Sequence, residues 1–586
     1  MSKIIYAYFR DKEKAQASKI KIKQICDSIN PDNIEPNPSS TYSISHTTYG
    51  ISNPVSTIRI NEKNILLGSL LNNYENWENT DVDYPDGNYA IFRQNEDVLE
   101  IVSDRLGTRS VWYYKDEEKF IVATSQRAII KFLGNFQFEE KVIPWMISTG
   151  NLSFYSWDKR ISLLPPSGSI LLDKKIWNYK IKVRKSIKEE QKEFPEIEYK
   201  KLLFDNLDAT FSQYTPDFSK WALSLSGGHD CRGILAFLSR SKKSISNLQT
   251  VTWGDKNAEN LKGSDANIAR KVAKCYKTKH HFYKLDFSDK NARTILERFL
   301  KNGEGRIDHI GGYLDGFKIW KNLFESEIEG LIRGNVLFSN ISASSEYQVR
   351  SFMGISLLSE IPNLSKFQFL AQLEQEVPER FSHRKNEKLS VYRDRLLAKY
   401  RIPIVQAALA DLKHSYVEEF NPLLTNRLID FTQMMPDHLR NNKVAFKEIV
   451  ASLDPYSEYA SKGNNNTKRN FLRSKQFLLS VEEELNSTHA REIFPQNFLN
   501  AVLSELHHSN QQNKPLWISL KSRIASLIPL KLKKKISGKI DTRKKLDIFT
   551  LVFRLTLISM MTRILKNEAG DHILILPILI SSVIFA

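Results

Sequence analysis

The sequence predicts an α/β protein in which a layered antiparallel β domain comes first and a parallel-sheet domain with a helical C-terminal part follows. Short apolar segments of period two, separated by Asn, Asp and Gly, fill the chain up to about residue 175. After about residue 221, apolar strands alternate with helices, which is the βαβ pattern of a parallel sheet. From about residue 368, helical spacing dominates. The length of 586 residues is too great for one core and favours two or three domains.

The composition is that of a folded, cytoplasmic protein. Apolar residues make up 41% and aromatic residues 11% of the chain, which excludes a wholly disordered or low-complexity sequence. Cys26, Cys231 and Cys275 are too few and too scattered for a disulfide framework or a zinc cluster. The N-terminal segment lacks the apolar core of a signal peptide, so we expect a cytoplasmic location. The net charge of +18 comes without a nucleic-acid-binding motif, so no specific nucleic acid is expected as a partner.

The first domain is predicted over residues 1–177. Its period-two apolar runs indicate strands, which we expect at residues 57–60, 63–71, 89–94, 97–104, 111–116, 119–125 and 169–173. Between residues 178 and 200 the chain becomes strongly charged, which is typical of a solvated connection between domains. We therefore expect a linker over 178–200.

The second domain is predicted over residues 201–470, and a helical extension over 471–586. Strands at 221–226, 248–254 and 280–285 enclose helices at 232–241 and 264–276, which gives two successive βαβ units. No further strand is expected between residue 368 and the apolar tail. That tail, residues 573–586, contains Pro577 and is shorter than the roughly 20 residues that cross a bilayer.

A glycine turn after the first strand of the second domain points to chemistry. The strand ends at Leu225, Ser226-Gly227-Gly228 form a tight turn, and a helix begins near Asp230. Glycines let a polyanion approach the backbone, and the free N–H groups of a helix start point toward it. Asp230 has the chemistry to hold a magnesium ion against phosphate oxygens. A bare glycine turn is often only structural, but the flanking strand and helix pattern favours a phosphate site here.

These residues resemble the pyrophosphate loop of the asparagine synthetase superfamily, which includes β-lactam synthetases and lasso-peptide cyclases. The second strand end, at Trp253, is similar to the family's adenine contact, and Lys462-Gly463 are similar to its closing Lys-Gly pair. The resemblance implies ATP and Mg²⁺ as cofactors, with Asp230 as the metal ligand and Lys462 as the catalytic residue that stabilises developing negative charge. It places ATP or pyrophosphate against Leu225, Ser226, Gly227, Gly228, Asp230, Cys231, Trp253, Arg333 and Gly334.

The N-terminal half resembles the family's class II glutamine amidotransferase domain. Asp86-Gly87, the segment from Asp104 to Gly107, and Ala123-Thr124-Ser125 carry this similarity. Active members have a cysteine after the initiator Met, and this chain has Ser2. Ser2 is left open as an N-terminal hydroxyl nucleophile, but serine is far less ionised than cysteine near neutral pH. We therefore expect a structural domain that does not hydrolyse glutamine.

Two further positions depart from the family. Asn335 and Val336 stand where the family has acidic residues that bind magnesium and accept a proton, and neither an amide nor a valine does this at neutral pH. Glu304, Asp308 and Glu346 are candidate substitutes, and each is more typical of an ordinary surface charge. Cys231 replaces a serine; a helix start can activate a thiol, but a simple exchange of small residues is the preferred interpretation.

The function expected from these residues is that of an ATP-dependent, AMP- and pyrophosphate-forming amide ligase. Its partners would be a small-molecule or peptide carboxylate and ammonia or another amine. Three alternatives stay open: a glutamine-hydrolysing asparagine synthase, an amide-forming tailoring enzyme for a peptide or sugar acid, and a non-catalytic scaffold member. The basic cluster from Lys531 to Lys545 is expected to be a solvated helix face, with peripheral membrane contact through it and the apolar tail as the alternative.

Overall fold

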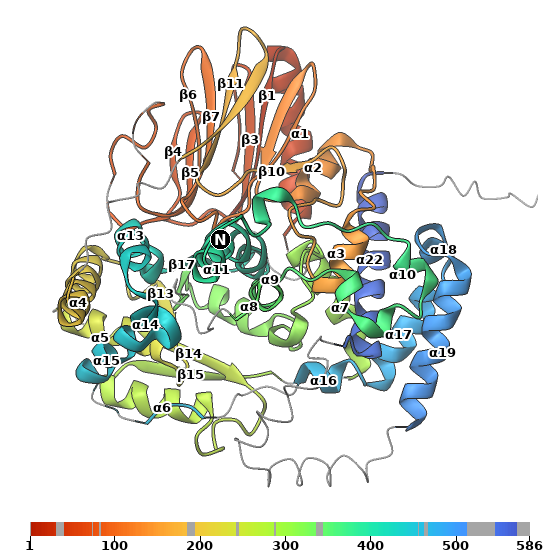
Figure 1. The fold of residues 1–586 in the computed structure, drawn as a ribbon. Helices are drawn as coiled ribbons and strands as arrows, with labels where there is room; N and C mark the ends of the chain where they lie inside the picture. Colours follow the sequence, from red (N-terminus) through yellow and green to blue (C-terminus); the bar gives the residue numbers. More distant parts are fainter. Residues whose placement is uncertain are drawn as a thin grey trace, which may run out of the picture.

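The computed structural model confirms the α/β class. It describes residues 2–30, 40–72, 74–80, 82, 84–184, 194–241, 245–285, 287, 289–335, 344–454, 456, 458–461, 467–512 and 545–570. Val336, Lys462, Gly463, residues 531–544 of the basic cluster and the tail 573–586 lie outside this part. Figure 1 shows the strands of the first domain stacked above the parallel sheet of the second, with the C-terminal helices to one side.

The first domain is a sandwich of two six-stranded antiparallel sheets. The strand orders are β10-β8-β9-β1-β3-β2 and β12-β11-β7-β6-β5-β4. The strands are β1 (Lys3–Phe9), β2 (Ser40–Ile44), β3 (Thr47–Ser52), β4 (Arg59–Asn61), β5 (Asn64–Leu70), β6 (Gly87–Gln94), β7 (Val98–Ser103), β8 (Trp112–Lys115), β9 (Lys119–Ala123), β10 (Ser162–Leu163), β11 (Gly168–Asp173) and β12 (Asn178–Val183). Alternate residues such as Tyr6, Ile65, Phe92 and Ile101 fill the layer between the sheets.

Three helices accompany these sheets: α1 (Lys12–Ser28), α2 (Gln126–Leu133) and α3 (Val142–Thr149). Helix α1 packs on the first sheet, where Ile22 and Cys26 lie against Gly50 of β3. The sequence did not indicate β1, α1, β2 or β3. The expected linker is also displaced, because β12 pairs with β11 and extends the second sheet to Val183, while residues 185–193 lie outside the described part.

The second domain contains a five-stranded parallel sheet in the order β15-β14-β13-β16-β17. The strands are β13 (Trp221–Ser224), β14 (Gln249–Gly254), β15 (Lys279–Lys284), β16 (Gly330–Ile332) and β17 (Glu418–Phe420). The first three confirm the predicted βαβ units, and their helices are α5 (His229–Arg240) and α6 (Asp265–Tyr276). β17 is a strand where the sequence indicated none. Because the chain runs outward from β13 in both directions, the strand order reverses between β13 and β16.

Helices cover both faces of the parallel sheet. Leu223 and Ile332 face one apolar cluster with α4, α5, α6 and α15, whereas Ala222 and Leu331 face the other. The remaining helices up to residue 453 are α4 (Glu196–Gln213), α7 (Ala292–Gly303), α8 (Lys318–Glu325), α9 (Glu346–Met353), α10 (Gln368–Ala371), α11 (Leu389–Leu396), α12 (Ala407–Asp411), α13 (Asn426–Met434), α14 (Asp437–Arg440) and α15 (Val444–Leu453).

The C-terminal part is helical, as predicted. It contains α16 (Thr467–Phe471), α17 (Lys475–Leu485), α18 (Thr488–Ile493), α19 (Gln496–Gln512) and α22 (Ile548–Glu568). By length and composition alone α22 could cross a membrane, but 78% of its most apolar stretch is buried inside the protein. It contacts α2 and α3 on one side and α17, α18 and α19 on the other (Figure 1). A core helix that ties the first domain to the C-terminal helices explains both its apolar composition and its burial.

Candidate nucleotide-binding site

The predicted glycine turn lies at the carboxyl end of the middle strand of the parallel sheet. β13 ends at Ser224, Leu225 donates its backbone N–H to the Val251 carbonyl at 2.9 Å, and α5 begins at His229. The turn therefore borders the place where the strand order reverses, between β13 and β16. In open α/β sheets, ligands bind in the crevice outside the carboxyl ends of the strands at this point.

The two glycines of the turn have different surroundings. A Cβ built on Gly227 would lie 2.5 Å from the Cβ of Ala460, whose N–H donates to the Gly227 carbonyl at 3.1 Å. The N–H of Gly227 donates to Asp265 Oδ1 at 3.2 Å. A Cβ on Gly228 would meet only Ser226 Oγ, at 3.4 Å. One face of the turn is thus packed, and the other is open to a ligand.

Helix α5 starts without a side-chain cap. Gly228 is its N-cap residue and makes no side-chain cap hydrogen bond, while its own N–H donates to Ser226 Oγ at 3.3 Å. The N–H groups that follow, in the first turn of α5, are left without that cap. Such N–H groups need an acceptor, and the helix dipole makes an anion the favoured one. This local geometry fits the phosphate group predicted from the sequence.

Asp230, the predicted metal ligand, is held by a lysine from another element. Its Oδ2 lies 2.5 Å from Lys443 Nζ, and its buried Oδ1 has no hydrogen-bond partner among the described residues. Burial raises the pKa of Asp230, and the charge of Lys443 opposes that rise.

The donor set does not fit a magnesium ion held by the protein. Asn335, at the end of β16, brings an amide in place of an acid, and Asp265 already accepts the Gly227 N–H. Among the described residues, no group of three His, Cys, Asp or Glu side chains could hold a metal ion. Asp265 and one oxygen of Asp230 are engaged by protein donors, and only Asp230 Oδ1 is left unpartnered, so the turn offers one free carboxylate oxygen and not a set of magnesium ligands.

The other predicted ligand contacts converge on the same edge. A Cβ on Gly334 would lie 3.0 Å from the Cβ of Asp230 and 3.1 Å from the Cys231 N, so the chain after β16 packs closely against the first turn of α5. Arg333 Nη1 donates to Ser224 Oγ at 3.0 Å, and its guanidinium lies 5.9 Å from the centre of the Trp253 ring. The Cys231 thiol is 3.7 Å from Ser226 Oγ, and burial raises its pKa. A thiol that resists ionisation is a packing residue and a poor nucleophile.

A segment that we call the strap, residues 458–461, covers the packed face of the turn. Tyr459 stacks on His229 with ring centroids 3.8 Å apart. The fully buried Arg232 donates to the Glu458 carbonyl at 2.5 Å and also bonds Asp454 and the Tyr456 carbonyl. Burial, followed by the charges of Lys447, Arg232 and Lys443, lowers the pKa of His229 to about 4. Lys462 follows the strap but lies outside the described residues, so its catalytic role stays a prediction.

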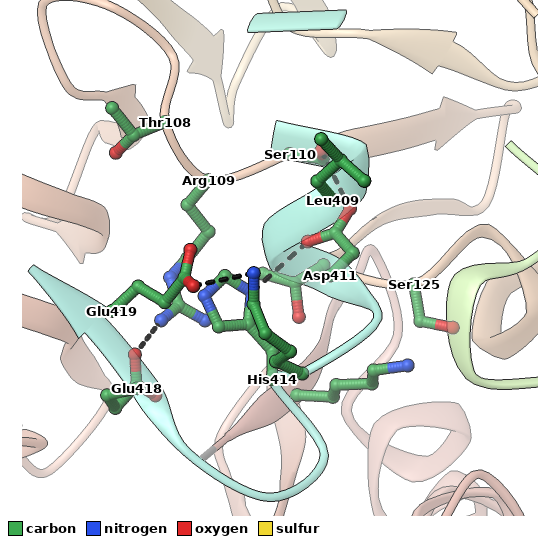
Figure 2. Close-up of polar contacts among 12 residues, drawn as sticks. Thr108, Arg109, Ser110, Ser125, Leu409, Asp411, His414, Glu418 and Glu419 are labelled. Carbon is green, nitrogen blue, oxygen red and sulfur yellow. Dashed lines mark hydrogen bonds and ion pairs between the residues drawn. The ribbon is translucent and has the colours of Figure 1, made fainter. Parts of the chain in front are cut away.

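A second group of polar residues joins the two domains (Figure 2). We call it the interdomain cluster: Ser2, Arg109, Ser110, Arg306, Asp411, His414 and Glu418. Glu418, on β17, is fully buried, accepts the Ser2 N–H at 3.1 Å and pairs with Arg109. Arg109 Nη1 also donates to the Ser2 carbonyl at 3.0 Å. Burial opposes ionisation of Glu418, but the charge of Arg109 outweighs it and holds the pKa of the carboxyl below its ordinary value.

The other half of the interdomain cluster centres on Asp411. Its Oδ2 accepts from Ser110 Oγ at 2.9 Å and pairs with Arg306, and its Oδ1 lies 3.2 Å from His414 Nδ1. Burial and then the charge of Arg109 lower the pKa of His414, so the imidazole is neutral at pH 7. Nearly complete pairing of buried charges is typical of a structural interface.

A small cavity adjoins this cluster, and Asn88, Arg109, Asn335, His414 and Glu419 are among its lining residues. It reaches the end of β16 through Asn335, but none of the residues from Ser226 to Asp230 lines it. The cavity therefore lies behind the glycine turn, on the side of the first domain.

Ser2 is not placed as a nucleophile. It is fully buried, and its hydroxyl donates to the Asn53 carbonyl at 3.2 Å. The three candidate substitute acids are engaged elsewhere. Glu304 accepts the Gln126 N–H at 3.0 Å, Asp308 pairs with Arg554 at 2.8 Å, and Glu346 pairs with Arg350 at 3.3 Å.

Sequence reasoning missed two basic residues at the turn: Arg232 and Lys443. Lys443 follows Asn442, and both have left-handed backbones, with φ of 59° and 54°. Nothing in the local pattern marks a lysine 213 residues away as the partner of Asp230. Only the packing of α15 on α5 brings them together.

Comparisons with known proteins found similarity to solved structures only. No protein-family profile matches the chain, and no curated protein matches it. Several solved structures are similar to part of it, among them two enzymes. The "allosteric regulatory enzyme of purine biosynthesis" has 8% identity and a TM-score of 0.20, with 48% of this chain and 80% of that chain covered. A "glutamine phosphoribosylpyrophosphate (PRPP) amidotransferase from B. subtilis complexed with ADP and GMP" has 7% identity and a TM-score of 0.18, with 48% and 81% covered. These TM-scores are too low to carry an argument about function.

Proposed function

We propose that this protein is an ATP-dependent, AMP-forming ligase that activates a carboxylate and transfers it to ammonia or another amine. One observation carries the proposal: an uncapped helix start and an open glycine lie at the carboxyl edge of the parallel sheet, where the strand order reverses. This edge is where α/β sheets bind nucleotides, and free N–H groups there suit a polyphosphate.

The chemistry assigned to the site has two balanced steps. The substrate carboxylate oxygen attacks the α phosphorus, the bond to the bridging oxygen breaks, and pyrophosphate leaves. The amine then attacks the acyl carbon, AMP leaves with the bond electrons, and the amine nitrogen loses a proton. Holding the acid beside the phosphate supplies as much as about 7 to 11 kcal/mol of the barrier by positioning alone.

The residues at the turn have distinct tasks in this proposal. The first-turn N–H groups of α5 and the open face of Gly228 receive the phosphates that leave. Arg333, which joins the ends of β13 and β16, opposes the negative charge that develops there. Trp253, beside Arg333, offers an aromatic face to the base of the nucleotide.

The amine is expected to come from solution. Ser2 is buried and its backbone N–H is bonded to Glu418, so a glutamine side chain has no path to its hydroxyl in this conformation. This favours a ligase that takes a free amine over the glutamine-hydrolysing asparagine synthase. The carboxylic acid substrate, whether aspartate, a sugar acid or a peptide side chain, is to be identified by the assay.

The test is ATP–pyrophosphate exchange with labelled pyrophosphate and a panel of carboxylic acids. We expect exchange with at least one acid, and its loss in Gly228→Val, because the new side chain occupies the open face. Gly312→Val is the matched control, since a Cβ there meets nothing within 4 Å. If Gly228→Val exchanges as fast as wild type, the turn is not the phosphate site.

A non-catalytic scaffold is the second candidate function. The pairing of Asp230 with Lys443 and the amide of Asn335 favour it, because both remove acid groups that an adenylating site uses. A protein that shows neither exchange nor ATP binding with any acid would support the scaffold.

A further inference from the structure

Lys443 pairs with Asp230, the residue that the sequence predicts as the magnesium ligand at the glycine turn. Its Nζ lies 2.5 Å from Asp230 Oδ2, and only 10% of its side chain is exposed. The Lys443 ammonium places its positive charge beside the Asp230 carboxylate, which is the group that would bind a magnesium ion. Asp230 Oδ1 has no partner among the described residues, so a cation that approached it would meet the positive charge of Lys443 on the other oxygen of the same carboxylate.

The lysine is held by the backbone as well as by its partner. Asn442 and Lys443 both adopt left-handed conformations immediately before α15, which directs the Lys443 side chain toward the start of α5. α15 is in turn fixed against α5, because Phe446 and Val450 lie within 3 Å of a Cβ built on Gly233. Lys443 therefore reaches the turn from a rigid element.

Positive charge surrounds the turn on several sides. Lys447 and Lys443 act on His229 from α15, and Arg333 stands at the end of β16. The negative groups nearby are already engaged: Asp265 with the Gly227 N–H, Asp454 with Arg232, and Glu419 with Lys413. Lys447, on α15, adds positive charge that acts on both His229 and Asp230, and the helix dipole of α5 adds to it. This charge complements a free polyphosphate better than a metal complex of reduced charge.

We propose that the glycine turn binds its polyphosphate ligand without a protein-held magnesium ion, and that the Lys443 ammonium supplies the positive charge in the metal's place. This inference rests on the proposed function, since it concerns the same ligand at the same turn. It goes further by naming the ligand form, a metal-free pyrophosphate or nucleoside triphosphate, and by assigning Lys443 to it. On binding, the ammonium is shared between Asp230 and a phosphate oxygen.

The experiment is calorimetric titration of the full-length protein with inorganic pyrophosphate and with ATP, in buffer with EDTA and in buffer with magnesium. We expect wild type to bind at least as tightly in EDTA as in magnesium. Lys443→Gln should weaken binding in EDTA by about tenfold or more, because a charged hydrogen bond is lost. Lys443→Arg should restore most of it. Lys23→Gln is the charge-matched control, since Lys23 is exposed on α1 and pairs only locally with Asp27.

Asp230→Asn should change polyphosphate binding in opposite directions, depending on whether Lys443 replaces the metal or Asp230 holds a magnesium ion. If Lys443 replaces the metal, the amide frees the ammonium, and binding in EDTA is kept or tightened. If Asp230 holds magnesium, the same change abolishes binding. Binding by wild type only in magnesium overturns this inference and leaves the proposed function in place. Failure of both ligands to bind in either buffer overturns the two together. Thermal unfolding of each variant verifies that the fold is kept.

Discussion

Replacing either glycine of the turn by alanine should have a different effect: loss of folding stability at Gly227, and loss of ligand binding at Gly228. In Gly227→Ala the new methyl lies 2.5 Å from Ala460 Cβ and 3.0 Å from Ile268 Cβ, which is closer than packed carbons approach. The strap cannot retreat freely, because Arg232 holds the Glu458 carbonyl at 2.5 Å. Overpacking of this kind costs about 1 to 3 kcal/mol of folding free energy.

Gly228→Ala changes the same chemical group one residue later. Its φ of −86° and ψ of 173° are open to any residue, and the new methyl meets only Ser226 Oγ at 3.4 Å. Alanine restricts the unfolded chain, which stabilises, and is a poorer N-cap residue than glycine, which destabilises. The two effects are of similar size, so the net change in stability should stay within about 0.5 kcal/mol.

Urea unfolding followed by tryptophan fluorescence measures both variants, and pyrophosphate titration measures the ligand. We expect Gly227→Ala to lose stability, and Gly228→Ala to keep stability but bind at least about tenfold more weakly, the equivalent of about 1.4 kcal/mol. A Gly227→Ala protein as stable as wild type would refute the packing of the strap on the turn. An unimpaired Gly228→Ala protein would refute the open face as the phosphate site.

Three further predictions concern the contacts that hold the domains and the strap. Burial raises the pKa of Asp86 from 3.8 to about 6, so between these pH values the folded protein binds a proton that the unfolded chain has lost. Stability should therefore fall by on the order of 3 kcal/mol as the pH rises through this window. Asp86→Asn, which keeps an oxygen for the Asn426 N–H, should remove that fall in a series of thermal melts; an unchanged pH profile would show that Asp86 is not its source. Glu418→Gln leaves the buried Arg109 without its partner and should cost about 3 to 5 kcal/mol in urea unfolding. The double variant Arg109→Met with Glu418→Leu should recover part of this loss, and no recovery would argue against an isolated charge as the cause. Arg232→Met should speed hydrogen exchange at residues 458–461 while leaving α1 unchanged, and equal protection of the strap would rule out Arg232 as its anchor.

Local patterns were enough to find the chemistry-bearing turn. The apolar run at β13, the glycine pair and the amphipathic α5 are each encoded within about a dozen residues, and the structure places them as expected. The order of β13, β14 and β15 followed from the same rule, because each crossover helix returns the chain to a parallel neighbour. Residues whose role depends only on their neighbours in sequence could be predicted.

What the sequence could not show depends on distant partners. β17 contains Glu418 and Glu419, two acidic residues that are typical of a protein surface in sequence. In the structure both are buried, and Arg109 and Lys413 neutralise them. Helix α1 carries its buried residues, Ala15, Ser18, Ile22, Ile25 and Cys26, at helical spacing, but the small residues at the first two positions and the exposed Ile20 weaken the apolar stripe. The contact between Asp230 and Lys443 spans 213 residues. The pairings of Glu418, Glu419 and Asp230 are fixed by tertiary packing, which leaves no local periodicity to detect.

A crystal structure of the protein soaked with ATP in the presence of EDTA would show directly whether the glycine turn binds a metal-free triphosphate. We expect triphosphate density over Gly228 and the first turn of α5, with Lys443 Nζ within hydrogen-bond distance of a phosphate oxygen. Density for the nucleotide at another edge of the sheet, or none at saturating ATP, would contradict it.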